Sequence, residues 1–280
     1  MEHKNVQTSD GVSLHYIEAG SGHPLVMIPG WSQSAAEYRN QIEAFGQMRR
    51  VIALDMRGHG ESEKTENGYR IQQLAKDLYD VIGALGIVKP DVLGHSMGAS
   101  IMWSYLSMFG DDKPFEKLVI VDQAPACVVQ AGWDDETKEN AGGSIPNSDA
   151  LSGFEAAVLN ADTPDAIKEV IRSMFTETVN EDDLDWIAAE NVKLPRGYAA
   201  PLLHDHCLID WRSQIKAIRN PTLVIGAEGS IFTTQSQRWI AAQIPGAEVE
   251  IFEADDGGSH FMFFQNPKRF NARVAAFLEG

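Results

Sequence analysis

Two hydrophobic patterns alternate along this chain, and together they predict a mixed α/β protein. Short, nearly uninterrupted apolar runs are typical of strands buried on both faces of a parallel sheet, whereas longer segments with an apolar side are typical of helices. The predicted strands are 4–8, 12–18, 25–28, 50–54, 91–93, 117–121, 222–225 and 248–252. The predicted helices lie near 71–85, 101–109, 235–243 and 267–278. The first two strands flank the turn Ser9-Asp10-Gly11 and should form an antiparallel hairpin.

A long segment, 124–215, interrupts this alternation with helical patterns alone. Amphipathic stretches occur near 151–159, 164–175 and 184–192, and no strand pattern accompanies them. Ligands of open α/β sheets bind beyond the carboxyl ends of the strands, so helices inserted there should cover the ligand. We therefore predict a core of 1–123 and 216–280 and a helical cap of 124–215. Alternatively, these inserted helices pack on the core without contacting the substrate.

The sequence Gly94-His95-Ser96-Met97-Gly98 stands where a predicted strand turns into a predicted helix. A G-x-S-x-G motif in that setting indicates a sharp, strained turn that exposes the serine, with glycines giving the backbone room. The first N–H groups of the following helix would lie beside the Ser96 hydroxyl, where a negatively charged oxygen could be stabilised. Ser96 is therefore the candidate nucleophile.

A serine nucleophile requires a base, and usually an acid that orients the base. The best candidate base is His260, which lies between the last predicted strand and the terminal helix. For the acid we favour Asp122, because it directly follows the strand 117–121. Glu228, after the strand 222–225, is the first alternative, and Asp255 or Asp256 is the second. Each choice keeps the chain order serine, acid, histidine.

The loop Pro29-Gly30-Trp31 follows the strand 25–28 and is the candidate for the second half of an oxyanion hole. Gly30 would permit a close backbone approach, so that the N–H groups of Trp31 and Met97 point at one oxygen. Residues predicted to line the substrate pocket are Gly30, His95, Phe154, Trp186 and Phe261.

Four motifs together resemble the α/β-hydrolase superfamily: 29–31, the loop 55–62, the turn 94–98, and 258–260. The resemblance implies the α/β-hydrolase fold, a mostly parallel twisted sheet with helices on both faces and a helical cap after the sixth strand. It also implies Ser96 as nucleophile and His260 as base. Two residues depart from the common pattern. Pro29 replaces a histidine, and Ser230 stands where the acid usually follows the seventh strand. Some members carry the acid after the sixth strand instead, and Asp122 matches that position.

These residues favour a cofactor-independent serine hydrolase that cleaves a carboxylic ester or lactone through an acyl-enzyme. The expected partner is a small, mostly apolar or aromatic substrate, and no metal is expected. A serine at the turn differs from the aspartate nucleophile of dehalogenases and epoxide hydrolases of this fold. The alternatives are a cofactor-free dioxygenase of the same fold, a perhydrolase or haloperoxidase-type activity, and a binding protein without catalysis.

Composition narrows the possible partners. The net charge of −17, from 23 basic and 40 acidic residues, argues against nucleic acid and anionic membranes as partners. Two cysteines, Cys127 and Cys207, are too few for a disulfide framework and lack the spacing of a metal motif, so we interpret them as ordinary thiols. The segment 1–5 lacks the apolar stretch of a secretory signal, and we expect a cytoplasmic protein.

Overall fold

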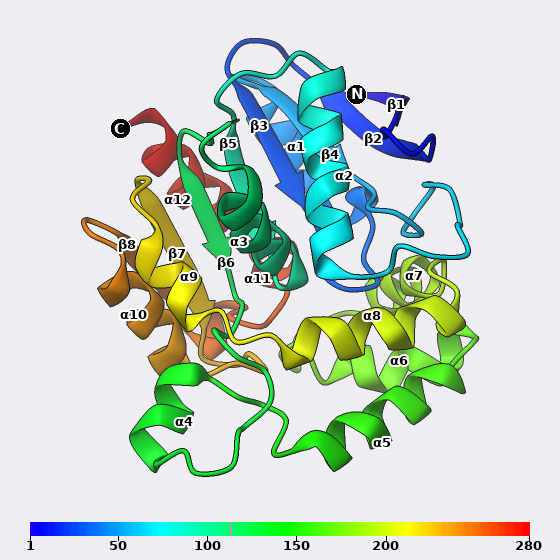
Figure 1. Cartoon of the computed structure of the whole chain (residues 1–280), viewed down its shortest axis with the longest axis vertical. Coiled ribbons are helices and arrows are strands. Elements are labelled where there is room, and N and C mark those ends of the chain that lie inside the picture. Colours follow the sequence, from blue (N-terminus) through cyan, green and yellow to red (C-terminus); the bar gives the residue numbers. More distant parts are fainter. Residues whose placement is uncertain (113) are drawn as a thin grey trace.

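A computed structural model describes residues 1–112 and 114–280 of the chain, which form one eight-stranded sheet (Figure 1). The strands are β1 (Glu2–Gln7), β2 (Ser13–Ala19), β3 (Pro24–Ile28), β4 (Arg50–Leu54), β5 (Asp91–His95), β6 (Leu118–Val121), β7 (Thr222–Ala227) and β8 (Glu248–Phe252). Their order across the sheet is β1-β2-β4-β3-β5-β6-β7-β8. β1 and β2 form the predicted antiparallel hairpin, and β2 also runs antiparallel to β4, whereas β3 to β8 are parallel.

Helices cover both faces of this sheet, as predicted. The longer helices of the core are α1 (Arg39–Phe45), α2 (Ile71–Ala84), α3 (Met97–Phe109), α10 (Thr234–Gln243) and α12 (Pro267–Glu279). The short elements are the 3-10 helices η1 (Ala35–Tyr38) and η2 (Ala254–Asp256), and α11 (Met262–Gln265). α2 and α3 pack together in one apolar core, and α1 and α12 pack in the other. This is the α/β-hydrolase fold.

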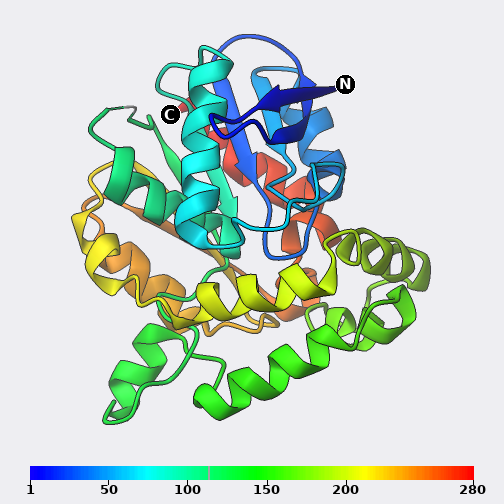
Figure 2. The same cartoon turned by 45° about the vertical axis from the view of Figure 1, so that its right-hand side comes forward.

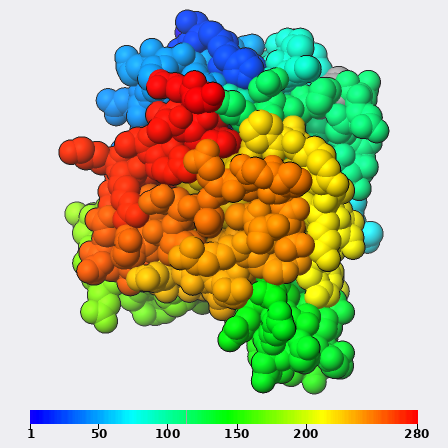
Figure 3. Space-filling model, turned by 90° about the vertical axis from the view of Figure 1, so that its left-hand side faces the viewer, coloured from blue at the N-terminus to red at the C-terminus, as the bar shows by residue number. Residues whose placement is uncertain are grey.

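Six helices lie between β6 and β7: α4 (Asp135–Ala141), α5 (Ser148–Leu159), α6 (Pro164–Arg172), α7 (Glu181–Asn191), α8 (Arg196–Leu208) and α9 (Arg212–Ala217). α5 packs on α8 and α6 on α7, and these four helices lie beyond the carboxyl ends of the parallel strands (Figures 1 and 2). α4 instead packs on α10, and α9 on α3. In Figure 3 the segment around α4 protrudes as a green lobe below the orange surface of the core.

Several helices, among them α1 and α8, were absent from the sequence prediction. α1 follows directly on η1, whose capping box joins Ser34 and Glu37, and only seven residues make up the helix. α8 continues through Pro201, which lacks the N–H of a regular helical residue. Its apolar positions face several neighbours, so it has no clear amphipathic pattern. Within the described chain, no helix combines the length and apolar character needed to span a bilayer.

The start of α3 approaches β3 so closely that only glycine fits at its second position. A Cβ atom on Gly98 would lie 2.2 Å from the carbonyl oxygen of Ile28. Since backbone atoms cannot yield as a flexible side chain can, a larger residue at this position must push α3 away from the sheet.

We expect Gly98→Ala to lower the free energy of unfolding by about 1–3 kcal/mol, because the added methyl overpacks this contact. Gly153→Ala in α5 is the matched control, since its Cβ would meet no atom within 4 Å. Alanine there should leave stability unchanged or raise it by about 0.5–1 kcal/mol. Urea unfolding measures both changes, and equal effects of the two substitutions would contradict this interpretation.

Candidate active site

Ser96 occupies the turn between β5 and α3 in a conformation that L-residues rarely adopt. Its backbone angles are φ 52° and ψ −126°. A Cβ on Gly94 would lie 2.7 Å from the Ala99 nitrogen, so the turn also needs glycine before the serine. The Ser96 N–H donates to the Val121 carbonyl over 2.8 Å, which fixes the turn to the end of β6. The chain thus forms the sharp strand-to-helix turn that the G-x-S-x-G sequence predicts.

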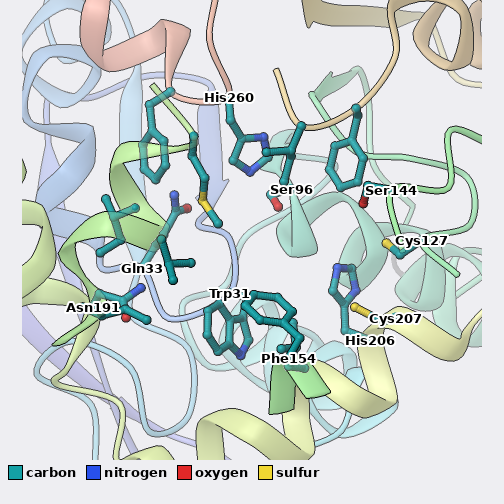
Figure 4. A pocket seen from close by; sticks show the side chains of 18 of the residues that line it. Trp31, Gln33, Ser96, Cys127, Ser144, Phe154, Asn191, His206, Cys207 and His260 are labelled. Carbon is teal, nitrogen blue, oxygen red and sulfur yellow. The ribbon is translucent and has the colours of Figure 1, made fainter. Parts of the chain in front are cut away.

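His260 and Asp122 meet at the carboxyl end of the sheet, although 138 positions separate them in sequence. The distance between His260 Nδ1 and Asp122 Oδ2 is 2.6 Å, and both side chains are buried. Asp122 directly follows β6 and has a positive φ of 49°. Ser96 and His260 line the same cavity, and Figure 4 shows both side chains on one side of it. The structure therefore brings together the three residues predicted as nucleophile, base and acid.

The alternative acids lie elsewhere. Glu228 is exposed, and its carboxylate accepts a hydrogen bond from the Ala254 N–H over 3.3 Å. Asp255 and Asp256 are exposed as well, and Asp256 pairs with Arg269. All three residues are exposed, and in the described chain the carboxylate that contacts His260 is that of Asp122.

Ser230, which stands at the usual position of the acid, hydrogen-bonds to the carboxylate beside His260. Its hydroxyl donates to Oδ2 of Asp122, the same oxygen that contacts the histidine. The Ser230 oxygen in turn accepts a hydrogen bond from the Phe232 N–H over 3.1 Å. Burial raises the pKa of the Asp122 carboxyl well above its usual range, and the Ser230 hydroxyl opposes this shift by donating to the charged form.

The protonation state of His260 follows from its surroundings. Burial away from water disfavours the charged imidazolium and lowers the pKa of His260 well below its usual value of 6.5. With Nδ1 directed at Asp122, the remaining ring nitrogen, Nε2, is the one available to accept a proton. Near neutral pH this arrangement can act as a general base.

Backbone N–H groups at two places border Ser96. In the described part of the chain, neither the Trp31 N–H nor the Met97 N–H donates a hydrogen bond to another group. A Cβ on Gly30 would lie 3.0 Å from the Ser96 Cβ, so glycine lets the loop after β3 pass directly beside the serine. The two predicted oxyanion donors thus belong to segments that meet at Ser96.

Gln33 holds the loop after β3 in shape, a contribution that the sequence did not reveal. Its Oε1 accepts from the Gly30 N–H at 2.5 Å and contacts Nδ1 of His95 at 2.9 Å. His95 Nε2 in turn lies 2.8 Å from the His260 carbonyl oxygen. These contacts link the loop after β3, the turn that carries Ser96 and the segment that carries His260. A glutamine three residues after a glycine gives no recognisable signal in one sequence.

Helices α7 and α8, which lie in the segment predicted as a cap, also contact the loop after β3. Trp31 Nε1 donates to the Ala199 carbonyl at 2.8 Å, and Arg196 Nη2 donates to the Ser32 hydroxyl at 2.8 Å. The Ser32 hydroxyl donates to the Asn191 carbonyl at 2.7 Å. Arg196 is buried and, among the described residues, forms no ion pair with a carboxylate. Desolvation lowers the pKa of its guanidinium to about 10.

The cavity above Ser96 contains about 800 Å³ of empty space, its open mouth included, and its walls are largely apolar. Phe154 and Phe261, two of the predicted pocket residues, line it. The cap contributes many of the remaining apolar wall residues: Ile167, Val170, Ile171, Met174, Ile187 and Leu203. Polar groups from Gln33, Asn191 and Ser144 also reach the wall (Figure 4).

Three predicted pocket residues lie outside the cavity wall. His95 is fully buried beneath the turn, because its two ring nitrogens contact Gln33 and the His260 backbone. Trp186 stacks on Phe264 with a distance of 6.0 Å between the ring centres, and the Arg39 guanidinium lies over the Trp186 ring, 4.7 Å from its centre. Gly30 borders Ser96 through its backbone and is likewise absent from the wall.

The structure also brings the two cysteines into this wall. Cys127, from the loop after β6, and Cys207, from α8, both line the cavity together with His206. A sequence separation of 80 residues conceals this proximity, and the interpretation of Cys127 and Cys207 as ordinary thiols did not foresee it.

Comparisons with known proteins agree with this architecture. A family model described as the alpha/beta hydrolase fold matches residues 23–143. The soluble epoxide hydrolase of Corynebacterium sp. (strain C12) is 38% identical over 123 residues, which are 44% of this chain and 42% of that protein. The non-heme chloroperoxidase CPO-A1 of Kitasatospora aureofaciens is 27% identical over 97% of this chain and 98% of that protein.

A solved esterase structure from Exiguobacterium antarcticum superposes over the full length of both chains, with a TM-score of 0.89 and 22% identity. At that identity the superposition supports the fold rather than a particular substrate. The relatives are named as epoxide hydrolase, chloroperoxidase and esterase, so they share the architecture but differ in their reactions. Residues 23–143 of this chain thus match the alpha/beta hydrolase family model, and the sheet topology and the structural match show the α/β-hydrolase fold over the whole chain.

Proposed function

We propose that this hydrolase cleaves a carboxylic ester or lactone with Ser96 as the nucleophile. The observation that carries the proposal is the meeting of a strained serine turn and a buried histidine–carboxylate pair at one apolar cavity. A neutral histidine beside a serine is the arrangement that activates a hydroxyl for acyl transfer. An aspartate nucleophile would suit epoxide opening, but this turn carries a serine.

The reaction follows from the geometry in two halves. Ser96 Oγ attacks the carbonyl carbon while His260 Nε2 takes the hydroxyl proton, and the N–H groups of Trp31 and Met97 stabilise the oxyanion. Collapse of the tetrahedral intermediate breaks the bond to the alcohol oxygen, which receives the proton from His260. Water then repeats the sequence on the acyl-enzyme and releases the carboxylic acid. Asp122 holds the ring in the required tautomer, and Ser230 holds Asp122.

The walls indicate which esters fit. Apolar side chains of the cap and of the loop around Phe261 surround the serine, and no lysine or arginine lines the cavity in the described chain. Burial of apolar surface contributes about 25 cal/mol per Å², so an aliphatic or aromatic group gains affinity here. The proposed substrates are therefore small, mostly apolar or aromatic esters and lactones.

Perhydrolysis is the second candidate, because a chloroperoxidase matches nearly the whole chain. In this reaction hydrogen peroxide replaces water as the acceptor of the acyl group. The acyl–oxygen bond to Ser96 breaks, a peracid forms and the serine hydroxyl is restored. The peracid then oxidises halide to hypohalous acid and is itself reduced to the carboxylic acid. The same serine, histidine and oxyanion donors would serve both reactions.

Labelling with a fluorophosphonate tests the nucleophile without knowledge of the substrate. We expect a single adduct on Ser96, located by mass spectrometry, and no adduct in Ser96→Ala or His260→Ala. Ser144→Ala is the matched control, since Ser144 lines the same cavity and, among the described residues, its hydroxyl forms no hydrogen bond with a histidine. An adduct on another residue, or none in the folded protein, would refute the proposal. Oxygen uptake by an unlabelled protein would favour the dioxygenase alternative.

The acid is tested by comparing two carboxylates. Asp122→Asn should lower kcat for a reactive aryl ester by about 10³–10⁴-fold, because the histidine loses its orienting charge. Glu228→Gln should change kcat by less than about threefold, since Glu228 faces solvent. Steady-state kinetics with matched unfolding curves measures both. The reverse ranking would rule out Asp122 as the acid.

The perhydrolysis candidate makes a separate prediction. With hydrogen peroxide, a short carboxylic acid or ester and bromide, the protein should brominate a dione indicator, and Ser96→Ala should abolish the signal. Omission of the acid or ester should abolish it too, because the peracid cannot form without an acyl group. Bromination that persists in Ser96→Ala would exclude this route.

A further inference from the structure

Cys127, His206 and Cys207 form a compact cluster in the wall of the Ser96 cavity. Each offers one ligand atom, and the three atoms all lie within 4.8 Å of one another. In a tetrahedral zinc site, metal bonds of about 2.0–2.3 Å place the ligand atoms about 3.5–3.8 Å apart. The observed cluster therefore needs only small side-chain adjustments to surround a metal ion. Figure 4 shows the three side chains grouped on one wall, beside Phe154.

The cluster contains a polar atom that lacks a partner. His206 is 4% exposed, and its Nδ1 is buried without a hydrogen-bond partner in the described chain. Buried ring nitrogens are normally paired, so an unpaired one calls for an explanation such as a missing ligand. Two cysteines that are 4% and 5% exposed complete a set of sulfur and nitrogen donors. This combination suits Zn²⁺ and other thiophilic metals rather than Mg²⁺ or Ca²⁺.

The backbone around the cluster is already fixed. The Trp211 N–H donates to the Pro125 carbonyl at 2.8 Å and so ties the segment between α8 and α9 to the loop after β6. The Cys127 carbonyl accepts from the Ile145 N–H at 3.0 Å. Gln123 Nε2 donates to Cys127 Sγ at 3.4 Å, as groups around a metal commonly orient its ligands. Hydrogen bonds of the backbone and of Gln123 thus hold the donors near one another.

We propose that Cys127, His206 and Cys207 bind a thiophilic divalent metal, Zn²⁺ foremost, through three protein bonds. The fourth position faces the cavity, because all three residues line it together with Ser96. Binding converts both thiols to thiolates and releases their protons to solvent. The bound ion would join the loop after β6 to α8 of the cap and occupy part of the substrate space. Zn²⁺ is therefore expected to inhibit the proposed hydrolase, while the metal site itself does not depend on that function.

Cobalt substitution tests the site directly. Reduced, metal-free protein titrated with Co²⁺ should develop a sulfur-to-cobalt charge-transfer band and the visible bands of a tetrahedral site. The bands should saturate at a single ion per chain and disappear on addition of Zn²⁺. Cys127→Ser, Cys207→Ser and His206→Gln should each weaken binding by more than about 100-fold. Far-ultraviolet circular dichroism confirms that each variant is folded.

His204→Gln is the matched control. His204 lies on the same helix but is exposed and pairs with Glu155 outside the cluster, so its loss should leave Co²⁺ binding unchanged. Absence of the charge-transfer band in the reduced wild-type protein would overturn the proposal. Equal binding by the ligand variants would do the same, since it would place the ion on surface histidines. So would a Cys127–Cys207 disulfide that resists reduction and leaves no thiols for the metal.

A second readout separates this proposal from the proposed function. Saturating Zn²⁺ should slow fluorophosphonate labelling of Ser96 by at least about tenfold in the wild type and leave it unchanged in Cys207→Ser. If labelling is absent even without metal, the hydrolase proposal fails, while the Co²⁺ titration still decides the metal site. If labelling proceeds equally with and without Zn²⁺ although Co²⁺ binds, the ion does not occupy the substrate space, and this part of the proposal is wrong.

Discussion

The left-handed backbone of Ser96 is the constraint on which the rest of the site depends. A residue with φ near +52° can exist only where its surroundings enforce the turn. Here Gly94 and Gly98 remove the side chains that would collide with the first turn of α3 and with the end of β3. Because β3 and β5 are neighbours in the sheet, the loop after β3 then passes directly beside the serine. The turn and the proposed oxyanion loop are therefore one structural unit.

The position of the acid follows from the geometry of a parallel sheet. β6 and β7 are paired, and the loops after both strands begin at the same edge. A carboxylate from either loop can therefore reach one histidine, and only the backbone path decides which does. Asp122 reaches His260 with a positive φ, while Ser230 on the neighbouring loop donates to its carboxylate. A serine in place of the usual acid is thus consistent with an intact histidine–carboxylate pair.

Sequence patterns predicted the local features of this protein better than its long-range contacts. β4 and β8 have the predicted bounds. β4 is an apolar run buried on the sheet, whereas β8 is the edge strand, in which apolar and acidic residues alternate and Phe252 is buried. The choice of Asp122 also rested on a local fact, its place at the end of a strand. The residues of the pocket wall, in contrast, could not be predicted from local patterns. Trp186 packs away from the cavity while Gln33 reaches it, and both outcomes depend on how α7 and the loop after β3 meet neighbours far away in sequence.

The cap and the loop beside Ser96 are mechanically coupled through buried polar groups. Arg196 on α8 donates to Ser32, and Trp31 donates to the Ala199 carbonyl. Moving α8 outward would break the Arg196–Ser32 hydrogen bond, although Arg196 would keep its acceptors at Asn191 and Leu194. It would also leave the Trp31 indole N–H without its acceptor, at a cost of about 1–3 kcal/mol. The loop that presents the Trp31 N–H is therefore shaped by the cap as much as by β3. Substitutions in α8 far from Ser96 can accordingly alter the geometry at the serine without touching a substrate.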